Sequence, residues 1–320
     1  MESIFSIPII DGSDCQPISK LELHNYGSGI VLFKNAIEVD QGSILPYLDE
    51  RVTFADCGIK VVEENGKRWA EDFSGNVIEH GIEMLSEQAL RLGSDPDNMP
   101  VQDDTPKPVA DFFQSCEEVI YKSLIRYIDM HPMILNTLWW KNRGHILKYS
   151  ANGILGEHND NDTNFRVVNG QRHPTSRPQA IYQVLACIIY LNDEYEGGEM
   201  YFPYADVEYK PVTGDLLFFP QNYVGTHGVR RITSGERYVY LSNFGQGGDE
   251  TVQISEANEA SPWVSPVYLP WIFQDYETYY NSGHSLSANT EGLLNPVQQK
   301  RPLEGLPEGP LLPYPAGELT

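Results

Sequence analysis

Two histidines and one carboxylate of this 320-residue chain have the types and order needed to bind one metal ion. His158 and Asp160 lie two positions apart, and His227 follows much later in the chain. Two imidazoles and a carboxylate can hold one face of an iron(II) ion and leave the opposite face open for substrate and dioxygen. Arg237, ten positions after His227 (237 − 227 = 10), could bind an acidic co-substrate. Together these residues indicate oxidative attack on an unactivated C–H bond.

The spacing of His158 and Asp160 suits a strand, because residues i and i+2 of a strand face the same side. We expect His227 to reach this pair from a turn that follows a neighbouring strand. A His-x-Asp triplet alone is a weak signal, so the hypothesis depends on the order of the whole set. Three other residues are kept as alternative ligands: Asp162, His145 and His173.

Strands from about residue 143 onward must position these side chains. Residues 180–191 form a nearly continuous apolar and aromatic run, which is typical of a strand covered on both faces. Arg237 shares strand parity with Val239 and Leu241, so we expect it to point into an apolar interior, where a buried arginine needs an anion. Further strands are expected at 145–149, 199–202, 215–219 and 237–244. Several short strands with turn signals suggest a β-sandwich or jelly roll.

Helices are expected on the N-terminal side of these strands. The clearest one begins near Pro108 and ends before Pro132. Its apolar residues recur at helical spacing, so one face should pack on a sheet. Shorter elements are expected earlier in the chain: a strand at 29–33 and helices at 42–48 and 82–92.

The composition restricts the class of protein and its partners. The net charge is −23, so the surface should repel nucleic-acid phosphates. No run approaches the roughly 18 apolar residues of a membrane span, and the N-terminus lacks the features of a secretory signal. The four cysteines form no CxxC pair, which suits reduced thiols in a cytoplasmic protein. We therefore expect a monomer or homodimer that binds neither nucleic acid nor membrane.

A longer pattern around the metal set resembles the iron(II)- and 2-oxoglutarate-dependent dioxygenases of the prolyl 4-hydroxylase-like superfamily. Residues 190–193 (YLND) and 197–203 (GGEMYFP) are similar to the YLN…GGxTxFP segment of that family, and 210–219 (KPVTGDLLFF) resembles its PxxGDxLxF segment. The similarity runs from Leu147 to Phe244, about a third of the chain. Each piece is weak alone, but the joint pattern is specific.

The resemblance implies roles for individual residues. His158, Asp160 and His227 would hold iron(II), and Arg237 would pair with the distal carboxylate of 2-oxoglutarate. Two tyrosines would complete the co-substrate site: Tyr190, which would donate to that carboxylate, and Tyr149, near its other end. The reaction would also consume dioxygen, with ascorbate as a reductant.

One residue departs from the family pattern. Met200 stands where the family often has threonine, so a hydroxyl that could assist the carboxylate anchor is missing. Asp160 is present, whereas related halogenases lack this carboxylate ligand, so halogenation is not expected.

The fold class expected from these patterns is α+β, mainly β, with a double-stranded β-helix core and supporting N-terminal helices. Residues 1–142 would form the N-terminal support region and 143–247 the dioxygenase core. Residues 248–320 would form a C-terminal extension, rich in aromatic residues at 263–280 and in proline at 296–320. The aromatic part should pack on the body or on another subunit.

The substrate is the least determined part of the hypothesis. Family analogy favours a prolyl residue of a peptide or protein, and the alternatives are a free amino acid, a small metabolite, or an inactive jelly-roll binding protein. The segment 161–179 reads as a long loop, and its cations could hold an acidic group of the substrate or pair with nearby carboxylates. These cations are Arg166, Arg172 and Arg177, with Arg230 and Arg231 following His227.

Overall fold

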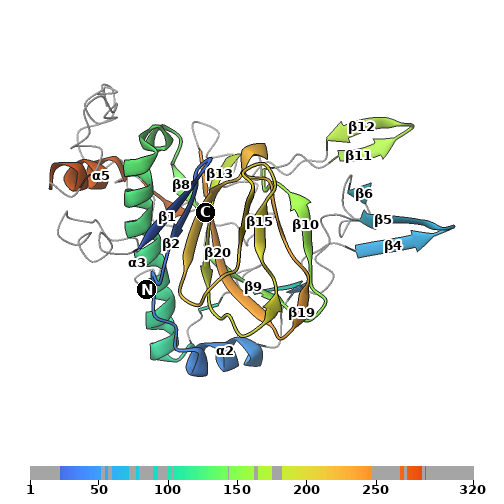
Figure 1. Cartoon of the computed structure of the whole chain (residues 1–320), viewed down its shortest axis with the longest axis horizontal. Coiled ribbons are helices and arrows are strands. Elements are labelled where there is room, and N and C mark those ends of the chain that lie inside the picture. The colour runs from blue at the N-terminus through green and yellow to red at the C-terminus, as the bar shows by residue number, and fades with distance from the viewer. Residues whose placement is uncertain are drawn as a thin grey trace.

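The structure is a computed structural model that describes residues 22–51, 55–56, 60–71, 77–78, 89–92, 100–101, 104–142, 144–161, 165–174, 182–246, 267–269, 272–282 and 285. Two antiparallel β-sheets lie face to face at its centre, and one long helix runs along the outer side of the larger sheet (Figure 1). The architecture is a double-stranded β-helix in an α+β, mainly β protein, which confirms the fold class predicted from the strand pattern.

The larger sheet joins strands from both sides of the core region. Its order is β1 (Leu23–Gly27), β2 (Ile30–Phe33), β17 (Leu216–Pro220), β13 (Gln183–Tyr190), β20 (Arg237–Gly245), β9 (His145–Tyr149), β7 (Ala89–Leu92) and β3 (Ala55–Asp56). At its margin β8 (Trp140–Lys141) pairs with β20 and with β21 (Val267–Tyr268). Strands that precede residue 143 therefore complete both edges of this sheet.

The smaller sheet faces the larger one and holds the metal-binding candidates. Its order is β10 (Leu155–His158), β18 (His227–Val229), β15 (Met200–Phe202) and β16 (Val207–Tyr209). A short pair, β14 (Glu196–Gly197) with β19 (Ile232–Ser234), lies beside it. These strands are short because glycine and proline turns interrupt them.

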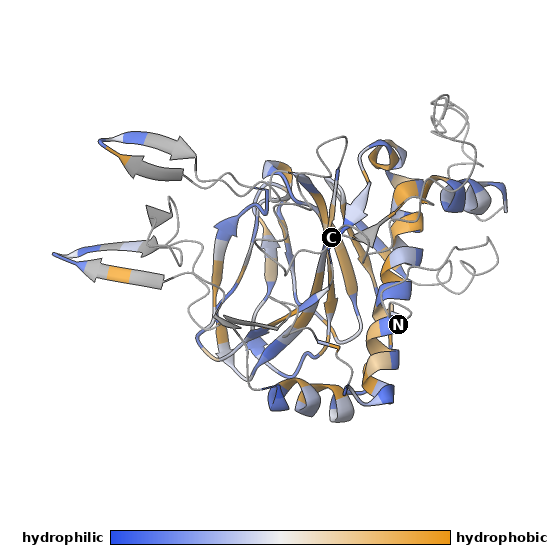
Figure 2. Cartoon of the chain, turned by 180° about the vertical axis from the view of Figure 1, so that it is seen from behind, coloured by the Kyte–Doolittle hydropathy of each residue, from blue (hydrophilic) through white to orange (hydrophobic). Residues whose placement is uncertain are grey.

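Strand β13 explains how the sheet can be apolar on both faces. Leu185, Cys187 and Ile189 belong to the cluster between the larger sheet and the long helix. The alternate residues, Ala186, Ile188 and Tyr190, belong to the cluster between the two sheets. Side chains of successive strand residues point to opposite faces, so the continuous apolar run of this segment is covered on both sides, as expected. Apolar colouring accordingly dominates the central strands (Figure 2).

The helices cover the outer side of the sheet. Helix α3 (Lys107–Met130) has Pro108 in its first turn and buries Phe113, Ile120 and Leu124, which confirms the predicted amphipathic helix. Helix α2 (Gln41–Glu50) extends the helix expected at 42–48, and two 3-10 segments follow later in the chain, η2 (Pro132–Asn136) and η4 (Tyr223–Gly225). Among the described residues, no helix is both long and apolar enough to cross a bilayer.

Helix α5 (Ile272–Asn281) fastens the C-terminal segment to α3 (Figure 1). The hydroxyl of Tyr121 donates to Asp275 Oδ2 at 2.5 Å, and Tyr276 and Tyr279 are fully buried. The aromatic residues of this helix therefore pack on the body. The proline-rich segment 296–320 lies outside the described residues.

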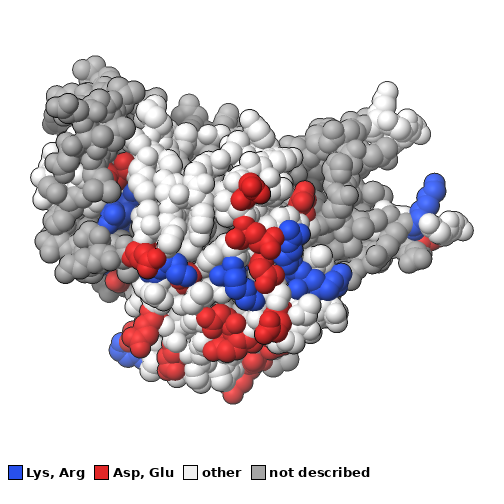
Figure 3. Space-filling view, in the orientation of Figure 1, with Lys and Arg blue, Asp and Glu red and all other residues white. Residues whose placement is uncertain are grey.

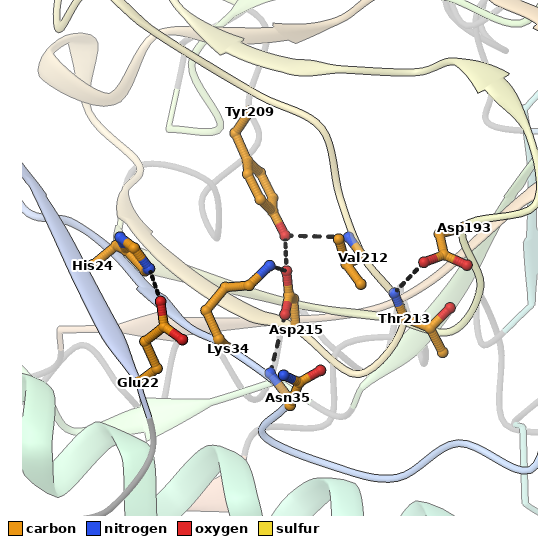
Figure 4. A network of polar contacts seen from close by, with 9 residues as sticks. All are labelled: Glu22, His24, Lys34, Asn35, Asp193, Tyr209, Val212, Thr213 and Asp215. Atoms are coloured by element: carbon orange, nitrogen blue, oxygen red, sulfur yellow. Dashed lines mark hydrogen bonds and ion pairs between the residues drawn. The ribbon is translucent and has the colours of Figure 1, made fainter.

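Asp215, in the PxxGD segment, ties the N-terminal strand to the core (Figure 4). Its fully buried carboxylate accepts hydrogen bonds from Lys34 Nζ at 2.5 Å, from the Asn35 backbone N–H at 3.0 Å and from the Tyr209 hydroxyl. The ring of Tyr209 in turn packs edge-on against Tyr190, with centroids 5.8 Å apart. A buried carboxylate is tolerated here because a cation and two donors satisfy it.

The helix predicted at 82–92 is wrong where the structure can test it. Ala89–Leu92 is strand β7, which pairs with β9 between Ala89 and Tyr149. The segment Ala-Leu-Arg-Leu is compatible with a helix by composition, but pairing with an existing sheet edge decides its conformation. Residues 79–88 lie outside the described part.

Two β-hairpins project from the same side of the molecule (Figure 1). One consists of β4 (Lys60–Glu64) and β5 (Lys67–Glu71), and β6 (Val77–Ile78) pairs with β5 as a third strand. The other consists of β11 (Phe165–Val168) and β12 (Gln171–Pro174). The second corrects the expectation that 161–179 is a plain loop. Asn169 and Gly170 both have positive φ, 52° and 76°, which is the geometry of an Asn-Gly hairpin turn.

Candidate active site

The structure brings His158, Asp160 and His227 together. The two histidines face each other directly in the antiparallel pair of β10 and β18, with ring centroids 4.3 Å apart. His158 Nε2 lies 3.3 Å from Asp160 Oδ1, and one ligand atom from each of the three residues lies within 4.8 Å of the others. This spacing suits three donors around one ion.

Two details of the sequence geometry were wrong. Strand β10 ends at His158, so Asp160 lies in the turn beyond it and does not reach the centre through strand parity. His227 begins strand β18, whereas it was expected in a turn. The rival carboxylate Asp162 lies outside the described residues. The alternative ligand His145 lies on β9 and is not part of the cluster, and His173 belongs to β12 of a separate hairpin.

Backbone carbonyls hold both imidazoles in the same way. His158 Nδ1 lies 2.8 Å from the Gly156 carbonyl oxygen, and His227 Nδ1 lies 2.9 Å from that of Gly225. A carbonyl oxygen can only accept, so we assign the proton of each neutral ring to Nδ1. Each Nε2 then presents a lone pair, which is the arrangement of a metal-ligating histidine.

The ionisation states of His227 and Asp160 also suit a divalent cation. Burial lowers the pKa of His227 to about 4, so this imidazole is neutral near neutral pH. Burial opposes ionisation of Asp160, but the nearby His227 and His158 hold its pKa well below its usual range. A neutral imidazole at His227 and an ionised carboxylate at Asp160 are the deprotonated forms that a metal requires.

Gln221 was missed by the sequence reasoning. It is fully buried, and its side-chain nitrogen lies 3.1 Å from Asp160 Oδ2 and 2.7 Å from Asn243 Oδ1. Its backbone carbonyl also accepts a hydrogen bond from the Asn161 N–H at 3.1 Å. The residue therefore fixes both the carboxylate of Asp160 and the turn that carries it. Its position two residues after the PxxGDxLxF segment, following Pro220, is the only sequence signal for it.

Arg237 lies deep in the apolar space between the sheets. It is 1% exposed, it stands opposite Tyr149 in the pairing of β20 with β9, and its guanidinium lies 5.1 Å from the ring centroid of Tyr149 and 5.3 Å from that of Tyr190. Burial opposes its charge, but the hydroxyls of Tyr195, Tyr190 and Tyr149 raise its pKa, so it stays cationic.

The donors around Arg237 are not satisfied by the protein. Nε and Nη2 of Arg237 and the hydroxyls of Tyr190 and Tyr195 have no hydrogen-bond partner among the described residues. Buried donors without acceptors are costly, and a buried guanidinium needs an anion. A carboxylate is the group that a planar guanidinium binds best, with two parallel hydrogen bonds. The residues present therefore fit a bound carboxylate group.

Unlike Arg237, the surface residues Arg230 and Arg231 have hydrogen-bond acceptors within the protein. Arg230 Nη2 donates to Glu208 Oε2 at 2.7 Å while its guanidinium stacks on Tyr201 at 3.9 Å, and Arg231 Nη1 donates to the Asn152 carbonyl at 2.8 Å. On the face drawn in Figure 3, basic and acidic side chains lie next to one another. Both arginines are thus satisfied by the protein itself. In the β11–β12 hairpin, Arg166 stands opposite His173 and Arg172 opposite Val167, and Arg177 lies outside the described residues.

Residues 144–245, about a third of the chain, match the family model of the 2OG-Fe(II) oxygenase superfamily. The chain is 29% identical over 109 residues to a protein of Acanthamoeba polyphaga mimivirus assigned as a prolyl 4-hydroxylase, and 24% identical over 123 residues to human prolyl 3-hydroxylase 2. These alignments span 29% and 35% of this chain but only 40% and 17% of the two relatives.

Among solved structures, a prolyl hydroxylase from Trichoplax adhaerens, bound to a fragment of the hypoxia-inducible factor oxygen degradation domain, is 13% identical with a TM-score of 0.43. That similarity covers 73% of this chain and 90% of the other. The match to the 2OG-Fe(II) oxygenase superfamily lies in residues 144–245, the region that holds His158, Asp160, His227 and Arg237. Its sequence likeness is to the prolyl 4-hydroxylase type, which confirms the resemblance stated above.

Proposed function

We propose that this protein is an iron(II)- and 2-oxoglutarate-dependent dioxygenase that hydroxylates a prolyl residue of a peptide or protein. The observation that supports it best is the buried guanidinium of Arg237, which has unpaired donors and whose charge acts on His227 of the His158, Asp160 and His227 cluster. An iron site explains the cluster, and a dicarboxylate co-substrate explains the arginine. The similarity to two prolyl hydroxylases supports the choice of a prolyl substrate.

Each group would have a distinct part in the reaction. His158, Asp160 and His227 would hold the ferrous ion on one face, which leaves the other face for substrate and dioxygen. The ion, when bound, supplies dioxygen activation coupled to oxidative decarboxylation of 2-oxoglutarate to succinate. Arg237 and Tyr190 would bind the distal carboxylate, and Tyr149 would line the site. The apolar residues around Arg237 would exclude water and strengthen these polar contacts.

The test is a reconstitution with Fe(II), 2-oxoglutarate and dioxygen. Succinate release should rise when a proline-containing peptide is added, and the peptide should gain one oxygen atom by mass spectrometry. The same peptide with alanine for proline is the control. Stimulation by free proline alone would favour the amino-acid alternative, and iron binding without any succinate release would favour an inactive binding protein.

The arginine hypothesis for substrate binding remains part of the proposal. Hairpin β11–β12 follows the metal-binding turn directly in the chain, so Arg166 and Arg172 could meet a substrate near the iron. Arg172→Gln and Arg177→Gln should raise the KM for an acidic substrate without changing iron binding. Unchanged kinetics on the true substrate would refute this role.

Three further points belong to the proposal. Ascorbate would act as a reductant that restores ferrous iron after uncoupled turnover, and omitting it should shorten the period of linear turnover.

The cytoplasm is the proposed location, because Cys116 and Cys187 are buried free thiols. The proposed domain boundaries are 1–142, 143–247 and 248–320, with a monomer or homodimer as the expected assembly.

A further inference from the structure

We propose that the hydroxyl of Tyr195 donates a hydrogen bond to the distal carboxylate of 2-oxoglutarate and replaces the hydroxyl that is absent at Met200. This inference rests on the proposed function, because it assigns a further residue to the same co-substrate site. Tyr195 would be a binding residue of this chain that lies outside the YLN and GG segments.

Tyr195 is a buried residue whose hydroxyl is free to bind a ligand. It is 5% exposed, and its hydroxyl has no hydrogen-bond partner among the described residues. The same holds for the Tyr190 hydroxyl and for Nε and Nη2 of Arg237. Four buried donors around one apolar space are best explained by one acceptor with several lone pairs, and a carboxylate offers about four acceptor sites.

Tyr195 is held in place by residues of the connecting segments around it. Lys210 Nζ lies 4.3 Å from the ring centroid and also donates to the Tyr195 carbonyl at 3.0 Å. A Cβ at Gly198 would lie 2.8 Å from Tyr195 Cε2, and one at Gly235 would lie 3.0 Å from its Cα. Gly198 therefore leaves room for the ring and Gly235 for the backbone of Tyr195. Such restraint lowers the entropy lost when the hydroxyl binds a ligand.

The chemistry of the hydroxyl suits a donor. Burial raises the pKa of Tyr195, and the charge of Arg237 offsets only part of this effect. Tyr195 therefore keeps its proton at neutral pH and can donate to an anion.

Met200 cannot donate a hydrogen bond to the distal carboxylate. It is 1% exposed on β15, opposite Val229, and belongs to the same apolar cluster as Tyr195 and Tyr190. Its thioether is at most a weak acceptor and carries no donor. The chain therefore carries no hydroxyl at position 200 of β15 but has one at Tyr195, in the segment that precedes β14.

The experiment measures the dissociation constants of two ligands by anaerobic calorimetry on the protein loaded with Fe(II). The first is 2-oxoglutarate, and the second is 2-oxopentanoate, which has a methyl group in place of the distal carboxylate. Tyr195→Phe should raise the 2-oxoglutarate constant about tenfold, because a hydrogen bond to a charged group contributes roughly 1.5 kcal/mol or more. The constant for 2-oxopentanoate should not change. Tyr195→Phe combined with Met200→Thr should recover part of the loss.

Tyr204→Phe is the matched control, because Tyr204 is 69% exposed and should have no effect. An unchanged 2-oxoglutarate constant in Tyr195→Phe, or an equal loss for both ligands, would overturn the inference while the proposed function stands. If the wild-type protein holds iron but binds no 2-oxoglutarate, the proposed function fails as well.

Discussion

His158 and His227 stand directly opposite each other on strands β10 and β18, and each ring is held by the carbonyl two residues before it. The short strands thus fix the distance between the rings, and the two carbonyls fix which nitrogen faces the centre. Neither imidazole has to change its proton position to accept a metal. The site is therefore preorganised by backbone geometry, which reduces the reorganisation needed on binding.

Gln221 should matter for iron affinity although it does not touch the metal. Gln221→Leu removes the donor that lies 3.1 Å from Asp160 Oδ2, so the carboxylate loses its fixed direction. Partners of metal ligands typically contribute about 10- to 100-fold in affinity. We expect the iron dissociation constant, measured anaerobically by titration, to rise within that range. Gln246→Leu, at an exposed position, should bind iron as the wild type does.

Gly225 is expected to tolerate no side chain. A Cβ there would lie 1.7 Å from the Pro220 carbonyl oxygen, which is backbone, so η4 would have to move. That movement would displace the carbonyl that holds His227 Nδ1. Gly225→Ala should therefore weaken iron binding in the same titration. Gly42→Ala in helix α2 meets only an ordinary contact and serves as the control; equal affinity in both variants would contradict this account.

Arg237 should lower the stability of the ligand-free protein while it contributes to 2-oxoglutarate binding. Its unsatisfied donors cost free energy in the absence of ligand, so Arg237→Met should raise the free energy of unfolding by about 1–3 kcal/mol when no 2-oxoglutarate is present. The wild type should gain stability from 2-oxoglutarate with iron, whereas the variant should gain none. Urea unfolding with and without both ligands measures each effect. A variant that is clearly less stable without ligand would show that Arg237 has an internal partner.

Breaking the buried ion pair of Lys141 and Glu117 should lower the free energy of unfolding, in contrast to the replacement of Arg237. Both side chains are 1% exposed, Lys141 Nζ lies 2.6 Å from Glu117 Oε2, and the Tyr240 hydroxyl donates to Oε1 at 2.6 Å. Lys141→Met leaves a buried carboxylate without its cation, which should cost about 3–5 kcal/mol in urea unfolding.

Two further variants test whether the lost stability of Lys141→Met comes from the uncompensated charge of Glu117. Glu117→Gln combined with Lys141→Met removes the uncompensated charge and should recover part of the loss. Lys107→Met breaks an exposed pair with Asp111 and should have little effect. A Lys141→Met variant as stable as wild type would refute the buried-pair argument.

Much of the core could be predicted because periodicity in the sequence reports burial directly. The run at 180–191 was recognisable as β13, and the apolar face of 107–130 as the long helix. The missed elements depend on pairing or on local turns. Strand β7 exists because a sheet edge was available, and two Asn-Gly turns, Asn65-Gly66 and Asn169-Gly170, mark hairpins that sequence patterning alone could have found.

The site was readable to the same degree. The residue types of His158, Asp160, His227 and Arg237 stand out in the chain, but their contacts do not. Gln221 and Tyr195 are ordinary residues of strand ends, and only the packing of distant strands shows what they face.

The central claim is that three side chains from β10, the turn after it and β18 hold a single ferrous ion. Anaerobic titration of the purified protein with Fe(II) tests it most directly, with His158→Ala, Asp160→Ala and His227→Ala beside the wild type. His24→Ala is the control, because His24 lies at an exposed position on β1, bonded to Glu22. We predict one iron per chain in the wild type and the control, and loss of tight binding in each of the three variants. Full iron binding by those variants, or none by the wild type, would contradict the account.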